Sequence, residues 1–171
     1  MNKSDFRRLL RYSDNCWAQL GDVLTTALHA AETWDARFDT TSHWNTVRLL
    51  LAHRIGAEER WITLRLQNHP LPVIYEDRAA ADWEGLYRDH QTVRAATYAY
   101  LDGLTDAAVA DETVVLRRDY AALTMADVLF HIVNHENYHR GQVVMTLQRH
   151  GIDPPNFDYI FLKEGTGQTR G

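Results

Sequence analysis

The sequence has little cysteine: Cys16 is the only one among 171 residues, so no disulfide can form within the chain. A structural zinc site with three or four cysteine ligands is also excluded. Any transition-metal site must therefore use histidine, aspartate or glutamate. The first fifteen residues, MNKSDFRRLLRYSDN, contain no long apolar run. We therefore expect a cytoplasmic protein with no signal peptide and no membrane association.

Positive charge is scarce as well. The chain has 18 lysines and arginines against 23 acidic residues, a net charge of −5, and no basic block. Nucleic-acid binding requires a positive surface that neutralises phosphates, so we expect no nucleic-acid partner. Hydrophobic residues make up 45% of the chain, which is enough to bury a substantial core at this length. We expect residues 1–171 to form a single domain.

Apolar residues recur at helical spacing in four segments, which predicts an all-α four-helix bundle. The first helix is expected from Ser4, as its N-cap, to Leu28. The fourth is expected behind Thr124, whose spacing to Asp127 resembles a capping box, and ends at Gly151. The other two helices are predicted at residues 43–66, behind Ser42 as N-cap, and at residues 82–101.

Two connecting segments lack a helical pattern. Residues 69–80 contain two prolines and are predicted to form a crossover rather than a helix. Residues 103–123 include the β-branched stretch ETVVLRRDY, which predicts a short irregular or hairpin-like segment between the third and fourth helices.

The motif HIVNHENYHRGQ, residues 131–142, places His131, His135 and His139 at intervals of four residues. At 100° per residue, His135 and His139 point toward the apolar stripe of the fourth helix, and His131 lies at its edge. A buried neutral imidazole needs partners for one donor and one acceptor nitrogen. A metal ion bound by the inward pair would satisfy this need, although hydrogen bonds in a polar core would also do so.

A third ligand is expected on the second predicted helix. His53 lies in an inward stripe at near-heptad spacing, which is typical of a bundle seam. Three histidines without a fourth protein ligand leave coordination positions open for water or substrate, as in reactive zinc sites. The metal ligands predicted from the residues are therefore His53, His135 and His139. The predicted stripe consists of Leu50, His53, Ala57, Trp61 and Leu64.

The order His135-Glu136-x-x-His139 also matches the signature of zinc proteases, with Glu136 as general base and Glu164 as a candidate third ligand. Such proteases hold an extended substrate against a strand edge, and this sequence predicts no sheet for that purpose. A carboxylate that orients a ligand histidine is a more common role for Glu136. We therefore treat proteolysis as a remote alternative.

Four residues near the predicted site have open roles. Glu136 is the nearest candidate base if the reaction is a hydrolysis. His131 is either a contact of a ligand or substrate, or an exposed polar residue. Arg140 could bind an anionic group or pair with a carboxylate. Gly141 is expected to permit close approach of another helix.

Three separated segments resemble motifs of the DinB/YfiT-like superfamily. LFHIVNHENYHRGQVVMTLQRHGIDPP resembles its fourth-helix motif with the H-x-x-x-H-R-G-Q pattern. LLLAHRIGAEERWI resembles the second-helix motif that carries a ligand histidine, and RYSDNCWAQL resembles the aromatic segment of the first helix. The resemblance implies a four-helix bundle with up-down-down-up topology and the ligands His53, His135 and His139.

The resemblance also implies functional expectations. Members of the superfamily typically bind zinc, nickel or a similar divalent ion, and many form homodimers. Characterised members include bacillithiol or mycothiol S-transferases and maleylpyruvate isomerase. We therefore expect a metal-dependent enzyme that acts on a small molecule and is either a thiol transferase or a hydrolase. For a thiol transferase, one substrate is a low-molecular-weight thiol. A non-catalytic metal-binding or stress-associated protein is the alternative.

Overall fold

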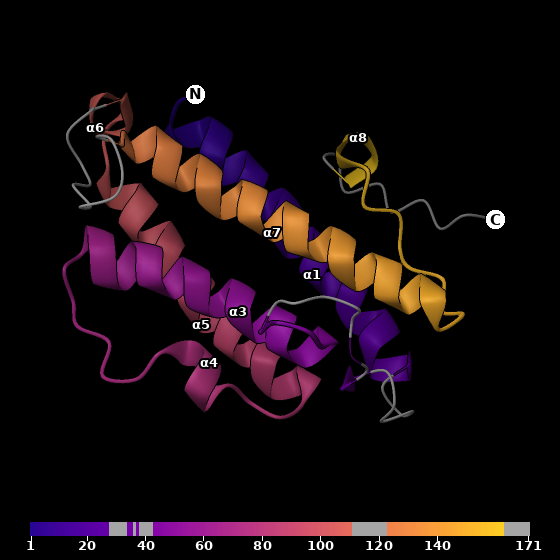
Figure 1. The fold of residues 1–171 in the computed structure, drawn as a ribbon. Helices are drawn as coiled ribbons and strands as arrows, with labels where there is room; N and C mark the ends of the chain where they lie inside the picture. The colour runs from indigo at the N-terminus through magenta and orange to yellow at the C-terminus, as the bar shows by residue number, and fades with distance from the viewer. Residues whose placement is uncertain (28–33, 36, 38–42, 111–122, 163–171) are drawn as a thin grey trace.

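A computed structural model describes residues 1–27, 34–35, 37, 43–110 and 123–162 of the chain. Four long helical segments dominate it (Figure 1). No strand occurs in these residues, and the only bridge among them joins Arg37 to Thr46. The predicted all-α class is therefore confirmed. The long segments are α1 (Lys3–Ala27), α3 (Val47–Glu59) continued by η1 (Arg60–Leu66), α5 (Trp83–Gly103) and α7 (Met125–Arg149), and the short helices are α4 (Tyr75–Arg78), α6 (Asp106–Ala110) and α8 (Tyr159–Leu162).

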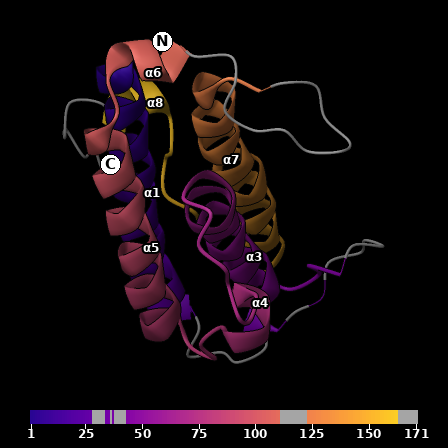
Figure 2. The same ribbon diagram turned by 90° about the vertical axis from the view of Figure 1, so that its left-hand side faces the viewer.

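The long helices pack around one another so that α1 and α3 each contact both α5 and α7. One apolar cluster joins the start of α1 and of α7 to the end of α5, through Phe6, Met125 and Leu101. A second cluster joins the end of α1 and of α7 to the start of α3, through Leu24, Leu147 and Val47. Helices α1 and α7 therefore run in one direction, and α3 and α5 run in the other (Figures 1 and 2).

Two predicted helix starts were wrong. The first helix begins at Lys3, and the side chain of Asn2, rather than that of Ser4, accepts from the amide of Asp5 at 3.0 Å. The second begins at Val47, where Thr46 is extended and its hydroxyl accepts from the amide of Leu49 at 3.1 Å. In each case an oxygen in the right backbone conformation, and not the first suitable residue type, determines the N-cap.

The fourth helix has the predicted ends. Thr124 and Asp127 form a reciprocal capping box at its start. Gly151 follows the helix with a φ of 73°, the left-handed conformation that favours glycine after a helix C-terminus. These two ends fix the register of the helix that carries the motif of residues 131–142.

Short helices occupy parts of both connecting segments. Helix α4 lies within the predicted crossover. It forms there because Tyr75 is fully buried and donates a hydrogen bond to Asp89 at 2.7 Å. Tertiary burial, which the local sequence does not reveal, stabilises this turn. Helix α6 occupies residues 106–110 of the segment predicted to be irregular, whereas the hairpin-like stretch 112–120, like Ser42 and Leu28, lies outside the described residues.

The inward stripe of the second helix is correct up to Trp61 and wrong at Leu64. Leu50, Ala57 and Trp61 are buried, but Leu64 is 39% exposed. Helix α3 passes into the π-helical segment η1, where the amide of Gln67 bonds the carbonyl of Ile62 five residues earlier. The wider turn rotates the following side chains away from the positions that a regular α-helix predicts. Among the described residues, no helix is long and apolar enough to cross a membrane.

Candidate metal centre

The side chains of His53, His135 and His139 meet between α3 and α7. One nitrogen from each ring lies within 4.8 Å of the other two. The Nε2 atoms of His135 and His139 are 3.1 Å apart. The ring of His53 is 5.1 Å from that of His135 and 5.2 Å from that of His139, measured between centroids. The structure therefore brings together the three histidines that the sequence singled out.

In two of the three rings, a hydrogen-bond acceptor lies next to the Nδ1 atom. Glu76 lies 3.1 Å from Nδ1 of His53, and the side-chain oxygen of Gln142 lies 2.6 Å from Nδ1 of His139. An acceptor at Nδ1 places the proton there and leaves a lone pair on Nε2. Both Nε2 atoms are thus prepared to act as ligands. Trp44 stacks on the His53 ring at a centroid distance of 4.3 Å and restricts its rotation.

This donor set fits a divalent ion. Nitrogens bound to tetrahedral zinc at about 2.0–2.1 Å lie roughly 3.3 Å from each other, close to the separation of the two Nε2 atoms. Burial and neighbouring histidines lower the pKa of His135 to about 3. Burial likewise lowers the pKa of His139 to about 4, against a smaller opposing effect of Gln142. Both rings are neutral at neutral pH, which is the form that binds metals.

Glu76 comes from α4, in the segment predicted to be a simple crossover. Burial opposes its ionisation, but hydrogen bonds with His53 and Arg60 lower its pKa to about 2. The carboxylate is therefore negative at neutral pH and increases the basicity of the His53 ring. No pattern in the sequence indicated Glu76. Gln142 follows His139 by three residues on the same helix, so helical spacing alone could have predicted their contact.

His131 lies outside the group of three. Its ring contacts Trp61 at a centroid distance of 5.3 Å and lies 5.5 Å from the His135 ring. Burial and Arg65 lower its pKa, so it is neutral at neutral pH. A narrow cleft lined by Trp61, His131, His135 and Glu58 has no room for a water molecule. His131 therefore lies beside His135 at a closed part of the bundle.

Glu136 faces the centre of the bundle and is only 2% exposed. Its carboxylate accepts from Ser13 and Arg54, from Nε1 of Trp17 at 2.9 Å, and pairs with Arg94 at 2.9 Å. Burial opposes ionisation, but Arg94 and Arg54 hold the pKa of Glu136 well below its usual range. The carboxylate is engaged on both oxygens by these four side chains, none of which belongs to the three-histidine group.

Glu136 also belongs to a second cluster of ionisable side chains. Oxygens of Glu58 and Glu136 and a nitrogen of His90 lie within 4.8 Å of one another, and all three residues are buried. Arg94 lies between the two carboxylates, 3.1 Å from Glu58 and 2.9 Å from Glu136. Its guanidinium already provides the positive charge that a cation would bring. This network was missed because Arg54, Glu58 and Arg94 resemble ordinary surface charges in the sequence.

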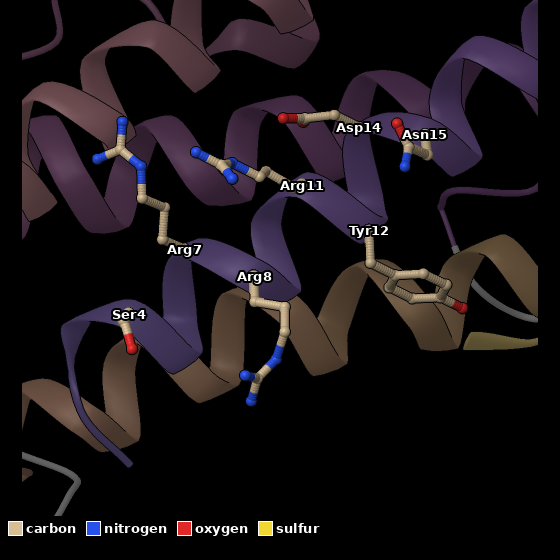
Figure 3. Close-up of a pocket in the computed structure, with 7 residues that line it drawn as sticks. All are labelled: Ser4, Arg7, Arg8, Arg11, Tyr12, Asp14 and Asn15. Atoms are coloured by element: carbon tan, nitrogen blue, oxygen red, sulfur yellow. The ribbon is translucent and has the colours of Figure 1, made fainter. Parts of the chain in front are cut away.

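A cavity of about 610 Å³ lies on the outer side of α1, away from this site. Figure 3 shows that its labelled lining residues, among them Arg7, Arg8 and Arg11, all come from α1. Arg7 pairs with Asp102 and Arg8 with Asp5, so two of the three positive charges are already balanced. Glu164, the third ligand of the protease hypothesis, lies outside the described residues.

Comparison with known proteins supplies one finding. The model of the DinB family matches residues 5–171. A search of curated proteins found no significant match.

Proposed function

Because the chain belongs to the DinB family, we propose that it binds one divalent metal ion, zinc or nickel, through His53, His135 and His139. The observation that carries this proposal is the convergence of three imidazole nitrogens, two of them on rings whose opposite nitrogen is held by Glu76 or Gln142. Three protein ligands leave open positions, which is typical of catalytic rather than structural sites. We further propose a metal-dependent enzyme that acts on a small molecule and works as a homodimer.

Thiol transfer is the reaction class that the surroundings favour. When bound, a divalent ion in such a site lowers the pKa of a thiol or water ligand and so generates a nucleophile. Hydrolysis also requires a base that takes a proton from water. The carboxylate of Glu136 is already bound by Arg54, Arg94, Ser13 and Trp17. The carboxylate of Glu76 is already bound by His53 and Arg60. A thiol is much more acidic than water and releases its proton to solvent when it binds the metal, so it depends less on such a base. We therefore favour a low-molecular-weight thiol as substrate.

The residues around the site contribute orientation and restrict access. Glu76 and Gln142 fix which nitrogen of their histidines is free, and Trp44 limits the rotation of His53. His131 and Trp61 line the narrow cleft beside His135, which has no room for a substrate in this conformation. The narrowness of this cleft is the observation that favours the alternative, a metal-binding protein without catalysis.

Metal analysis of untagged protein tests the proposal. We expect about one zinc or nickel ion per chain in the wild type. In His53→Ala we expect the affinity to fall by at least roughly 100-fold, because losing a ligand costs at least as much as losing an outer partner of one. His69→Ala, at an exposed histidine of the crossover, is the matched control and should bind as the wild type does.

A protein without stoichiometric metal, or a His53→Ala variant with unchanged affinity, would contradict the site. The same preparations decide between the two functions. Transfer of a low-molecular-weight thiol to an electrophilic acceptor should occur with the wild type and His69→Ala and be lost in His53→Ala. Metal binding without any such transfer would favour the non-catalytic alternative.

Gln142→Leu should weaken metal binding by roughly tenfold, because His139 loses the acceptor that keeps its proton on Nδ1. Competition against a chelator measures the affinity. Gln148→Leu makes the same chemical change on the same helix at an exposed position and should have no effect. Equal affinities for the two variants would show that Gln142 does not orient the ligand.

A further inference from the structure

Arg140 lies on the side of α7 that faces α1 and the C-terminal segment, whereas His135 and His139 face α3. It is 4% exposed. Its Nη2 donates to the hydroxyl of Tyr12 and to the side-chain oxygen of Asn137, both at 2.7 Å. The guanidinium also lies over the rings of Tyr12 and Phe157, at 5.0 and 5.3 Å from their centroids. All these partners are neutral groups.

Among the residues that the structure describes, the positive charge of Arg140 therefore has no counter-ion. Burial raises the pKa of Tyr12 to about 12, so its hydroxyl stays neutral at neutral pH. No carboxylate of the described residues forms an ion pair with Arg140, in contrast to Arg54 and Arg94, which both pair with Glu136. A buried guanidinium without a counter-ion is costly. This cost points to an anionic group that the described residues do not supply.

A cavity of about 490 Å³ lies directly beside this side chain. Arginine has five N–H donors, and the three on Nε and Nη1 make no hydrogen bond to the described part of the chain. Gly141 keeps the cavity open, since a Cβ added there would meet nothing within 4 Å. The predicted role of Gly141 in close helix approach was therefore wrong. Tyr12 also lines this cavity, and its side chain extends from α1 toward the C-terminal segment (Figure 3).

The remaining wall carries negative charge. Asp153 and Asp158 line the same cavity and are exposed, and neither pairs with the guanidinium. A polyanion would be repelled by these carboxylates, whereas a ligand with one anionic and one cationic group would satisfy both sides. The volume is within the usual range for small-molecule sites.

We propose that this cleft is a second ligand site, separate from the metal centre, which binds a zwitterionic small molecule of amino-acid or dipeptide size. The anionic group of the ligand meets the free N–H donors of Arg140. Its ammonium group faces Asp153 and Asp158. The hydroxyl of Tyr12, which donates to the carbonyl of Phe157 at 2.6 Å, holds the C-terminal segment that completes the wall.

Calorimetric titration of the full-length protein, as purified, tests this site. The probes are the twenty amino acids and diglycine, with N-acetyl-diglycine and diglycine amide as analogues that each lack one charge. We expect at least one zwitterion to bind and its two single-charge analogues to bind at least tenfold more weakly. Gly141→Leu, which fills the cleft without touching the hydrogen bonds of Arg140, should reduce binding at least tenfold.

The stability of this variant separates a ligand site from a structural role. Leucine has a higher helix propensity than glycine, so Gly141→Leu should raise the midpoint of urea unfolding while binding falls. Gly103→Leu is the matched control, because a Cβ there also meets nothing within 4 Å and it lies outside the cleft. Binding of no zwitterion, equal binding of the analogues, or unchanged binding by Gly141→Leu would each overturn the proposal. None of these outcomes depends on metal binding by the histidines.

Discussion

Glu136→Leu should lower the free energy of unfolding by about 3–5 kcal/mol, the usual cost of removing one partner from a buried ion pair. Glu136 is fully buried and balances two guanidinium groups, those of Arg54 and Arg94. Arg54 is 2% exposed and Arg94 is 3% exposed, so neither can turn to water when the carboxylate is removed. Leucine removes the carboxylate that pairs with Arg54 and leaves Arg94 with Glu58 and Asp14 alone. It also leaves Ser13 and Trp17 without their acceptor.

Urea unfolding followed by circular dichroism measures this loss. Asp102→Asn is the control, since it removes an acidic partner of an arginine at the surface, where Arg7 and Asp102 are 38% and 49% exposed. Such a pair contributes less than about 1 kcal/mol. A Glu136→Leu variant as stable as Asp102→Asn would show that the arginines find other partners or solvent.

The ion pair also joins the two helices that carry the histidines. Arg54 follows His53 on α3, and Glu136 follows His135 on α7. Because the ion pair between Arg54 and Glu136 fixes these two helices relative to each other, it also fixes the position of His53 relative to His135. The residue that looked like a protease base is therefore placed to hold the ligands in register through the bundle core.

The second large effect is an acid-dependent loss of stability caused by His90. This ring is 3% exposed, and it stacks on Trp17 at a centroid distance of 4.2 Å. Burial lowers its pKa from 6.5 to about 4, more than the nearby Asp14 raises it. The unfolded chain therefore binds a proton between pH 6.5 and 4 that the folded protein does not bind.

Stability then decreases as the pH falls through this window. The contribution of His90 to the free energy of unfolding is fully present above pH 6.5, and about 3 kcal/mol of it is lost by pH 4. This figure corresponds to about 1.36 kcal/mol for each unit by which the folded pKa lies below the unfolded one. His90→Gln removes the titrating group, so the variant should lose about 3 kcal/mol less than the wild type over the same range. His69→Gln, at an exposed histidine, should retain the wild-type slope.

Urea unfolding at half-unit pH intervals, with metal removed, gives both curves. Metal-free conditions matter because bound metal would stabilise the folded state by mass action. Since His135 and His139 also have lowered pKa values, the comparison uses the difference between variant and wild type rather than the total slope. Parallel curves for His90→Gln and wild type would contradict the assignment.

The sequence determined the features that depend on local periodicity. The helical spacing of apolar residues predicted the all-α class, and the capping residues Thr124 and Gly151 predicted both ends of α7. Because those ends fix the helical phase, the directions of His135 and His139 followed from 100° steps alone. The inward stripe of the second helix placed His53 opposite them for the same reason.

The tertiary structure alone decided features that depend on contacts between distant segments. Glu76 reaches His53 from a short helix that forms because Tyr75 is buried, which no local pattern indicates. The π-helical turn at residues 60–66 exposes Leu64, since a change of helical pitch shifts every later side chain. Arg54, Arg94 and Glu136 are charged residues that become a buried network only because three helices bring them together. The sequence thus predicted which three histidines converge in the candidate metal centre, and packing determined the residues that contact them.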